Sequence, residues 1–368
     1  MKTILYGGIG RHNFGDLLFP HIVHRLIKEN INESEIEFCD VVSRDMTEFG
    51  GHDVKSIANF IDYENDVNVI HVGGEIGGCK LTNAVKMCEP LTDKQKIEFK
   101  KLKTYKMPLG YVLPKSLFKK PKTFIANSVG RLSIPYAGFY KDFDYVSFRD
   151  EKSYKELSAK KIKCNLSPDS AILTKYFFND LISNRSSFDS IKTIHNKIGT
   201  EYIAVQIKTR YLKKVVSFEK VLSKIISKTN LPILFFCAGV APGHDSLDLY
   251  KEKFKNLPND KVHFFDSLNI WDICNVISNS KLVIGTSLHV RILSQQFLRP
   301  RVTLDIGSKH DAFIRNWDNI NNLNINLKTI TSNVNEIIQN HDFEADEKQL
   351  KFLQTKYLEK ANWVNLLK

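Results

Sequence analysis

The sequence Thr3-Ile4-Leu5-Tyr6-Gly7-Gly8-Ile9-Gly10-Arg11-His12-Asn13-Phe14-Gly15-Asp16 runs from a short apolar segment into a glycine-rich turn. Apolar side chains then recur at helical spacing over residues 16–27. This pattern predicts a strand, a tight turn and a helix. Strand-like and helix-like segments keep alternating after it, which is typical of βαβ units and a mostly parallel sheet.

The alternation occurs twice along the chain. We expect further strands at Ile36–Cys39, Val67–Val72, Thr123–Ala126, Tyr145–Phe148, Ile162–Leu166, Tyr202–Ile207, Ile233–Cys237, Val262–Phe265, Leu282–Ile284 and Val302–Leu304. The predicted fold class is α/β, with two Rossmann-like domains that face each other across a cleft. The expected divisions are an N-terminal domain over residues 1–178, a polar linker over 179–200, a C-terminal domain over 201–341 and an amphipathic helix over 342–368.

Composition agrees with two globular domains. The chain has 368 residues, of which 42% are hydrophobic and 26% charged. No apolar run reaches the ~18–20 residues of a membrane span, and the first apolar segment is shorter than the ~7–15 residues of a signal peptide. The 6 cysteines are scattered without a Cys-x-x-Cys pair. We therefore expect a cytoplasmic protein with reduced cysteines and no metal site.

Positive charge is concentrated between Lys94 and Lys122. This segment has ten lysines and one acid, Glu98, in a chain whose formal net charge is +12. A solvated helix face is one interpretation, and an acidic substrate or a lipid surface is the other. The aromatic residues among these lysines follow no known stacking pattern for bases, so we expect no nucleic-acid partner.

Two glycine-rich turns of the first domain carry acids. The turn after the first strand lacks the Gly-x-Gly-x-x-Gly spacing, and Asp16 stands where the helix begins, so a phosphate there would be repelled. The second turn, His71-Val72-Gly73-Gly74-Glu75-Ile76-Gly77-Gly78, holds Glu75 at the sheet edge where open α/β sheets bind ligands. Asp16 as a helix cap and Glu75 as an exposed turn residue are the structural alternatives. The functional interpretation is that both accept hydrogen bonds from sugar hydroxyls.

The second domain has a turn of the opposite kind. Gly285-Thr286-Ser287-Leu288-His289-Val290-Arg291 contains hydroxyls, a histidine and an arginine but no acid. Such a helix start is suited to an anion. For His289 the alternative is a hydrogen-bonded histidine of the first turn, and for Arg291 it is a surface salt bridge.

Five segments together resemble the polysaccharide pyruvyltransferase family. They are Asn13-Phe14-Gly15-Asp16, the strand end Gly73-Gly74, Val146-Ser147-Phe148-Arg149-Asp150-Glu151-Lys152-Ser153, Ser167-Pro168-Asp169-Ser170-Ala171, and Ser287-Leu288-His289 followed by Pro300. They occur in the family's order over about residues 1–305. The resemblance implies a glycosyltransferase-B-like architecture. It also implies an enzyme that moves the enolpyruvyl group of phosphoenolpyruvate onto a sugar diol as a cyclic ketal.

The resemblance also implies roles for single residues. The family's phosphoenolpyruvate-binding arginine falls on Arg149, and its catalytic histidine falls on His289, beside Leu288. Ser287 stands where some members have an arginine, so another cation must supply that anion contact. The candidates for this contact are Lys208, Arg210 and Arg291. Gly73-Gly74-Glu75 departs from the commoner Gly-Gly-Gly form, and Asp169 is expected to be a structural turn residue.

The chemistry of such a transfer matches these side chains. Histidine titrates near neutral pH and can protonate the methylene carbon of phosphoenolpyruvate. A carboxylate, Asp16 or Glu75, can act as the base, and Asn13 can join them in holding the acceptor. Phosphoenolpyruvate is a co-substrate in this scheme, and neither a cofactor nor a metal is required. We expect the donor in the second domain and the acceptor against the first.

The predicted function is a pyruvyltransferase of a cell-surface polysaccharide, such as a capsule or cell wall, or of its lipid-linked precursor, working in the cytoplasm with peripheral contact to the membrane. One alternative is a nucleotide-sugar glycosyltransferase of the same two-domain architecture. That enzyme needs an acid late in the second domain to hold the ribose, and Asp305 and Asp311 are available. The other alternative is a non-catalytic carbohydrate-binding protein.

Overall fold

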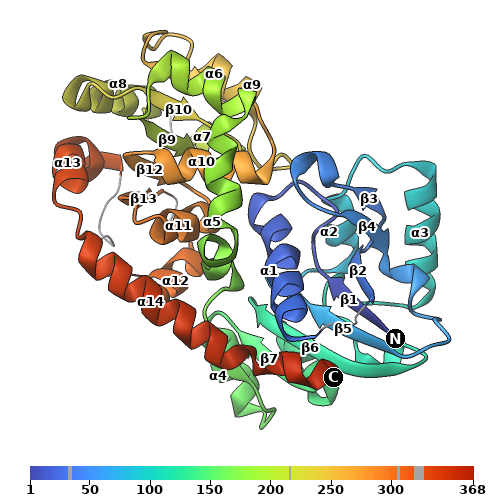
Figure 1. Ribbon diagram of the computed structural model, residues 1–368. Helices are drawn as coiled ribbons and strands as arrows, with labels where there is room; N and C mark the ends of the chain where they lie inside the picture. The colour runs from blue at the N-terminus through green and yellow to red at the C-terminus, as the bar shows by residue number, and fades with distance from the viewer. Residues whose placement is uncertain (32–34, 215–216, 305–306, 319–326) are drawn as a thin grey trace. The chain divides into compact units, whose positions relative to one another are not determined.

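The computed structural model describes residues 1–31, 35–214, 217–304, 307–318 and 327–368. These residues form two compact units, each built on its own sheet. Unit 1 comprises Met1–Leu173 together with Leu353–Lys368, and unit 2 comprises Thr174–Phe352. The chain therefore leaves unit 1, forms all of unit 2 and returns to unit 1 within one helix, α14 (Phe343–Lys360), which is drawn in red in Figure 1.

Unit 1 contains an 8-stranded sheet in the order β3-β4-β2-β1-β5-β6-β7-β8. Its strands are parallel, except that β3 runs antiparallel to β4. In chain order they are β1 (Lys2–Tyr6), β2 (Glu35–Asp40), β3 (Arg44–Asp45), β4 (Asp53–Ser56), β5 (Val67–His71), β6 (Pro121–Val129), β7 (Tyr145–Phe148) and β8 (Asn165–Leu166). The short pair β3–β4 was missed by the sequence analysis because it has too few apolar residues for a visible alternation.

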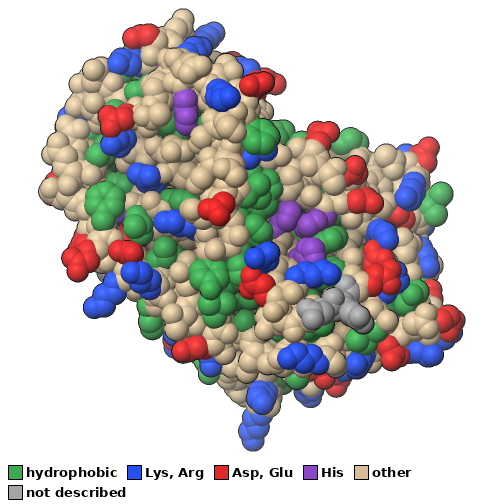
Figure 2. All heavy atoms as spheres, in the orientation of Figure 1, with side chains coloured by type: hydrophobic (Ala, Val, Ile, Leu, Met, Phe, Trp, Pro, Cys, Tyr) green, Lys and Arg blue, Asp and Glu red, His purple; other side chains and the backbone are tan. Residues whose placement is uncertain are grey.

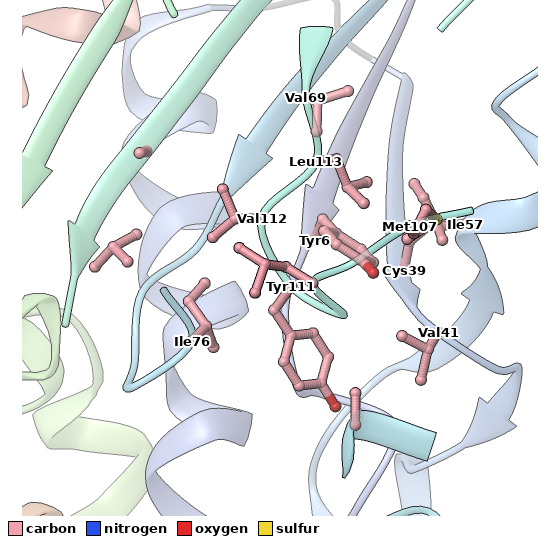
Figure 3. Close-up of a cluster of buried hydrophobic side chains, with 14 of the residues drawn as sticks. Tyr6, Cys39, Val41, Ile57, Val69, Ile76, Met107, Tyr111, Val112 and Leu113 are labelled. Carbon is pink, nitrogen blue, oxygen red and sulfur yellow. The ribbon is translucent and has the colours of Figure 1, made fainter. Parts of the chain in front are cut away.

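Helices of unit 1 cover this sheet (Figure 1). They are α1 (Phe14–Asn30), α2 (Leu81–Lys86), α3 (Asp93–Thr104) and α4 (Glu151–Ala159), with 3-10 turns that include η5 (Ser170–Leu173) and η8 (Ala361–Leu367). Ile4 and Tyr6 of β1 share one face, since alternate residues of a strand point the same way. Figure 3 shows the core there, where the Tyr6 ring lies 6.1 Å from that of Tyr111.

The C-terminal end of the expected amphipathic helix packs its apolar side chains on unit 1. Leu353, Tyr357 and Val364 are all buried. The Tyr357 hydroxyl donates a 2.9 Å hydrogen bond to the Asn127 side chain, and the Tyr145 hydroxyl donates to the Lys360 carbonyl over 2.7 Å. These apolar side chains are therefore covered by protein.

Unit 2 contains a 5-stranded sheet in the order β11-β10-β9-β12-β13. The pairings between these neighbouring strands are all parallel. The strands are β9 (Ile203–Gln206), β10 (Ile233–Phe235), β11 (Val262–Phe264), β12 (Leu282–Gly285) and β13 (Arg301–Thr303). Its helices are α5 (Thr174–Asn184), α6 (Asp189–Ile198), α7 (Thr209–Lys214), α8 (Phe218–Thr229), α9 (Leu247–Lys253), α10 (Ile270–Asn279), α11 (Leu288–Gln296), α12 (Ser308–Trp317) and α13 (Leu327–Gln339).

The segment expected to be a linker is helical. Residues 179–200 lie in α5, a 3-10 turn and α6, and they belong to unit 2. Its polar residues bond inward: the Arg185 guanidinium and the Ser190 hydroxyl reach the buried carboxylate of Asp272 at 2.5 and 2.9 Å. Within α6, Ile191 and Ile194 are buried at helical spacing, so the polar composition of the segment concealed a short amphipathic helix.

Two Rossmann-like sheets are thus present, and the α/β fold class is confirmed. Each sheet has a point where the chain changes direction along the strand order, between β1 and β5 in unit 1 and between β9 and β12 in unit 2. Open α/β sheets bind ligands at the carboxyl ends of strands flanking such a point. These two sheet edges are therefore the expected positions of ligand-binding residues.

Candidate functional site

The carboxyl edge of the unit 1 sheet carries both predicted glycine turns. Gly7 and Gly8 follow β1, and Gly73 and Gly74 follow β5, so the turns flank the change of direction. Gly74 has a φ of 90°, and a Cβ there would lie 3.2 Å from a carboxylate oxygen of Asp16. A Cβ at Gly8 would lie 2.7 Å from the Arg11 guanidinium. The missing side chains therefore give room to Asp16 and Arg11.

Arg11 and Asp16 form a buried ion pair at this edge. The Nη2 atom of Arg11 lies 2.8 Å from Oδ2 of Asp16, and both side chains are at most 10% exposed. Burial works against the charged guanidinium, but the Asp16 carboxylate raises the pKa of Arg11 above its usual value. The prediction that Asp16 caps α1 is wrong. Asn13 is the N-cap of α1, and Asp16 lies in the first turn of the helix. Its negative charge is offset by Arg11, which the sequence analysis had not used.

Asp40 stabilises the glycine turn after β1 through hydrogen bonds to the backbone. Its carboxylate accepts hydrogen bonds from the backbone N–H groups of Gly10 and Val41, over 2.7 and 2.5 Å. Burial raises the pKa of Asp40 to about 6, although these hydrogen bonds and Arg11 act in the opposite direction. Asp40 ends β2, the neighbour of β1, so only the strand order reveals its place beside the turn.

Asn13 and Glu75 are the more accessible of the predicted acceptor residues. The Asn13 side chain makes no capping hydrogen bond with α1 and is partly exposed. The Glu75 side chain is 36% exposed, and its carboxylate lies 3.8 Å from the guanidinium of Arg131. Glu75 is therefore only loosely paired with Arg131, whereas Asp16 is held by a short contact.

Arg149 follows β7 at the same edge. It is buried and forms an ion pair with Asp169, whose second carboxylate oxygen accepts a 2.9 Å hydrogen bond from the Ala171 backbone. Burial opposes the charge, whereas Asp169, Glu75 and Asp16 raise the pKa of Arg149. The structure thus brings Arg149 into the electrostatic neighbourhood of both candidate bases. Asp169 supports a turn, as expected, and also holds this arginine.

In unit 2 the candidate turn follows β12. Ser287 is the N-cap of α11, but its side chain makes no capping hydrogen bond. Leu288 and His289 begin the helix, both are buried, and the first turn of α11 contains no acid. The acid-free helix start predicted from the sequence is therefore present.

The three candidate cations of unit 2 lie in different surroundings. The backbone N–H of Lys208 donates to the Thr286 hydroxyl over 2.9 Å, which places Lys208 against the candidate turn. Arg210 lies in α7 and is exposed. Arg291 is not at the surface: its Nε and Nη1 atoms contact Asp318 at 2.6 Å and Thr303 at 2.9 Å. The expected surface salt bridge of Arg291 is wrong, because the side chain turns inward to the buried Asp318.

Gln206 connects three loops of this edge. Its side-chain N–H groups donate to both carboxylate oxygens of Asp245 at 2.8 Å, and its carbonyl accepts the backbone N–H groups of Thr286 and Ser287 at 3.1 and 2.9 Å. The Asp245 carboxylate also accepts a 2.7 Å hydrogen bond from the Ala238 backbone. Burial raises the pKa of Asp245 to about 6. The sequence analysis missed both residues, although Gln206 is a polar residue at the end of a buried strand.

His310 is a second buried histidine near the same turn. It lies in the first turn of α12, and the Thr286 backbone faces its ring. Burial lowers its pKa to about 3, and the positive charges of Lys309, Lys208 and Arg291 act in the same direction. Asp311 forms a 2.8 Å ion pair with Arg315 on α12, and Asp305 lies outside the described residues.

Neither a metal-ligand cluster nor a membrane-spanning helix is found among the described residues. In the part of the chain that the structure describes, no three His, Cys, Asp or Glu side chains are grouped as metal ligands. None of the described helices has the length and apolarity to cross a membrane.

Comparisons with known proteins agree with both the motifs and the fold. The family model for polysaccharide pyruvyl transferase matches residues 13–308. Among curated protein sequences, none matches.

Solved structures of two kinds of sugar enzyme are similar to this chain in fold. The UDP-N-acetylglucosamine 2-epimerase of Rickettsia bellii has a TM-score of 0.59 at 12% identity, with 99% of this chain and 97% of that chain covered. The UDP-GlcNAc 2-epimerase of Neisseria meningitidis has a TM-score of 0.58 at 9% identity, with 100% of both chains covered. The trehalose 6-phosphate synthase of Burkholderia multivorans has a TM-score of 0.50 at 9% identity, with 100% of this chain and 95% of that chain covered. At these identities the likeness shows the glycosyltransferase-B-like fold alone.

Proposed function

Because the chain belongs to the polysaccharide pyruvyl transferase family, we propose that it moves the enolpyruvyl group of phosphoenolpyruvate onto two hydroxyls of one sugar, releasing phosphate. The family makes it a transferase enzyme. The observation that carries the finer proposal is the acid-free first turn of α11, where His289 stands at the carboxyl edge of the unit 2 sheet.

His289 is the proposed acid. It donates a proton to the methylene carbon of phosphoenolpyruvate, which leaves an oxocarbenium-like centre at the carbon bearing the phosphate. One sugar hydroxyl attacks that carbon, the carbon–oxygen bond to phosphate breaks, and the second hydroxyl closes the ketal. Each hydroxyl loses one proton: one restores His289, and the other is taken by the carboxylate base and passes to the departing phosphate.

The donor needs cations for its carboxylate and its phosphate. Arg149 is the proposed phosphoenolpyruvate contact from unit 1, because it directly follows β7 at the carboxyl edge of the sheet and Asp169 holds its guanidinium there. Lys208, Ser287 and Leu288 are the proposed contacts from the α11 turn, with Arg210 as a further cation on α7. Arg291 is already bound to Asp318, so it supports α11 from inside rather than contacting the donor.

The acceptor is proposed to bind at the carboxyl edge of the unit 1 sheet. Asn13, Asp16 and Glu75 supply oxygen and amide groups for sugar hydroxyls there. The ion pair with Arg11 supports Asp16 as a hydroxyl acceptor, and the looser surroundings of Glu75 support it as the base. The acceptor class is a cell-surface polysaccharide, or its lipid-linked precursor at the inner face of the membrane.

A phosphate-release assay tests this function. The purified protein is given phosphoenolpyruvate with a panel of α- and β-hexosides, and proton NMR of the product looks for the methyl signal of a ketal. Phosphate release that depends on both substrates, with a ketal methyl, is expected. Turnover of nucleotide sugars in place of phosphoenolpyruvate would instead identify a glycosyltransferase, and sugar binding without any turnover would identify a binding protein.

A further inference from the structure

Gln206 occupies the change of direction in the unit 2 sheet. It is the last residue of β9, directly beside β12, and its side chain is almost fully buried. Its carboxamide is used at both ends, as donor to Asp245 and as acceptor for Thr286 and Ser287. One side chain thereby joins the ends of β9 and β12 to the loop after β10.

The residues that Gln206 holds come directly before α11. Thr286 and Ser287 are followed by Leu288 and His289, so His289 lies two residues beyond the last backbone N–H bound by Gln206. Ser287 makes no side-chain cap, and its backbone N–H donates to the Gln206 side-chain carbonyl. The Thr286 N–H is shared between that side-chain carbonyl and the backbone carbonyl of Gln206. Lys208 adds a second tie through the Thr286 hydroxyl.

We propose that Gln206 is a positioning residue for the transfer reaction: it sets the placement of His289 through the turn at Thr286 and Ser287, and Asp245 holds its amide in the required orientation. This inference rests on the proposed function, in which His289 protonates phosphoenolpyruvate. It adds a residue and a contact chain that the family's motif does not include.

Only a carboxamide satisfies all these partners. Met has a similar shape but would remove the side-chain acceptor of the Ser287 N–H and both hydrogen bonds that Gln206 donates to Asp245. The Thr286 N–H would keep only the backbone carbonyl of residue 206. Asp245 would keep its hydrogen bond from the Ala238 backbone. A glutamate keeps the acceptor but places a second negative charge beside Asp245. When one of the two carboxyls is protonated, a donor and an acceptor are both restored. The charged or titratable groups near Asp245 are Lys208, Tyr250 and Cys237.

The first experiment compares Gln206→Met with a matched control, Asn275→Leu. Asn275 is an equally buried carboxamide of unit 2, and it donates to the Ile182 carbonyl and the Ser186 hydroxyl, away from the α11 turn. Gln206→Met should lower kcat by ~10²-fold, as expected for a misplaced reacting group, with the KM for phosphoenolpyruvate changed less than about threefold. Asn275→Leu should keep kcat within about threefold. A kcat of Gln206→Met no lower than that of the control would overturn the proposal.

The second experiment uses Gln206→Glu and pH. Its kcat relative to the unchanged protein should recover as pH falls from about 8 to about 6, because the two carboxyls then share a proton. Gln206→Met should show no such recovery. A pH-independent ratio for both variants would mean that Gln206 acts only through general stability.

A third measurement separates this inference from the proposed function. The ring signals of histidine-labelled protein are followed by NMR, with His289 assigned from His289→Gln. The chemical shifts of the His289 ring should change in Gln206→Met and stay unchanged in Asn275→Leu. If the unchanged protein releases no phosphate, the proposed function fails, while an unshifted His289 signal in Gln206→Met refutes the positioning role by itself.

Discussion

The guanidinium of Arg149 is paired with the carboxylate of Asp169, 20 residues further along the chain, inside unit 1. Gly130 leaves room for this arginine, since a Cβ there would lie 2.8 Å from its Nε. A cation that is fixed on one side by a buried acid needs little reordering when an anion binds on the other. The pair thus explains how an arginine can be buried and still be suited to an anionic substrate.

Arg149→Ala should therefore affect both binding and stability. We expect the KM for phosphoenolpyruvate to rise at least tenfold, because a charge-assisted contact is lost. The free energy of unfolding should fall by roughly 3–5 kcal/mol, since Asp169 is left buried without its cation. Steady-state kinetics and urea unfolding measure the two effects. An unchanged KM together with an unchanged kcat would remove Arg149 from the site.

His289→Ala should stop turnover without unfolding the protein. Loss of a general acid typically costs ~10²–10⁴ in rate, and phosphoenolpyruvate binding should persist because the cations remain. His195→Ala, a half-buried histidine of α6, is the matched control. Activity of His289→Ala within threefold of that of the unchanged protein would show that His289 is not the general acid.

The two candidate bases should respond differently to loss of charge. Glu75→Gln should lower kcat with little change in unfolding free energy, because Glu75 is partly exposed and loosely paired. Asp16→Asn should destabilise unit 1, since the buried Arg11 loses its carboxylate partner. A Glu75→Gln variant with full kcat would instead direct attention to Asp16. Asp16→Asn can then be assayed at low temperature, where it is folded.

Acid should destabilise the protein below about pH 6.5 through its buried histidines. Burial lowers the pKa of His21 and His71 to about 4 and that of His52 to about 2. Unfolding returns each to 6.5, so the unfolded chain binds more protons and stability is lost as pH falls from 6.5 toward 4. Asp40, whose pKa is raised to about 6, acts in the opposite direction. The pKa of Asp245 is also raised to about 6 and acts like Asp40, whereas the pKa of His310 is lowered to about 3. These four histidines therefore outnumber the two acids.

His52→Phe tests this pH dependence. Figure 2 shows histidine side chains gathered on the surface over α1, and the His52 ring stacks on Phe38 at 3.6 Å. Phenylalanine keeps the stacking and removes one titrating group, so the loss of urea stability between pH 7 and about 5 should be smaller than in the unchanged protein. An equal loss would show that His52 does not titrate in this transition.

The lysines of α3 provide a test of membrane contact. Lys94, Lys100, Lys101 and Lys103 are exposed, and Ile97 between them is 67% exposed. Changing these four lysines to Gln should weaken binding to vesicles containing anionic lipid, at ~1 kcal/mol per lysine, and activity on a lipid-linked acceptor. Activity on a soluble glycoside should be spared. Four exposed lysines on and after α4 form the control set, Lys152, Lys155, Lys160 and Lys161. Equal effects of both sets would mean that the α3 lysines form a solvated surface and do not contact the membrane specifically.

Local patterns predicted most of the strands, and the glycine turns lie at the ends of strands as expected. Every expected strand overlaps an observed one, because buried parallel strands are short apolar runs whatever surrounds them. The partners within each site were not predictable in this way. Asp245 lies 39 residues from Gln206, and Thr286 lies 80 residues from it. Such contacts depend on strand order, which periodicity does not specify. The prediction that Arg291 lies at the surface was wrong for the same reason, because its buried partner Asp318 lies 27 residues away along the chain.

The return of the chain to unit 1 has a consequence for biosynthesis. Leu353–Lys368 are part of unit 1, and Trp363 and Tyr357 within this segment are fully buried. A ribosome makes these residues only after all of unit 2 has been translated. Unit 1 therefore cannot finish folding as it emerges, even though its sheet is synthesised first. Unit 2 is continuous, so its last residue is synthesised before the last residues of unit 1.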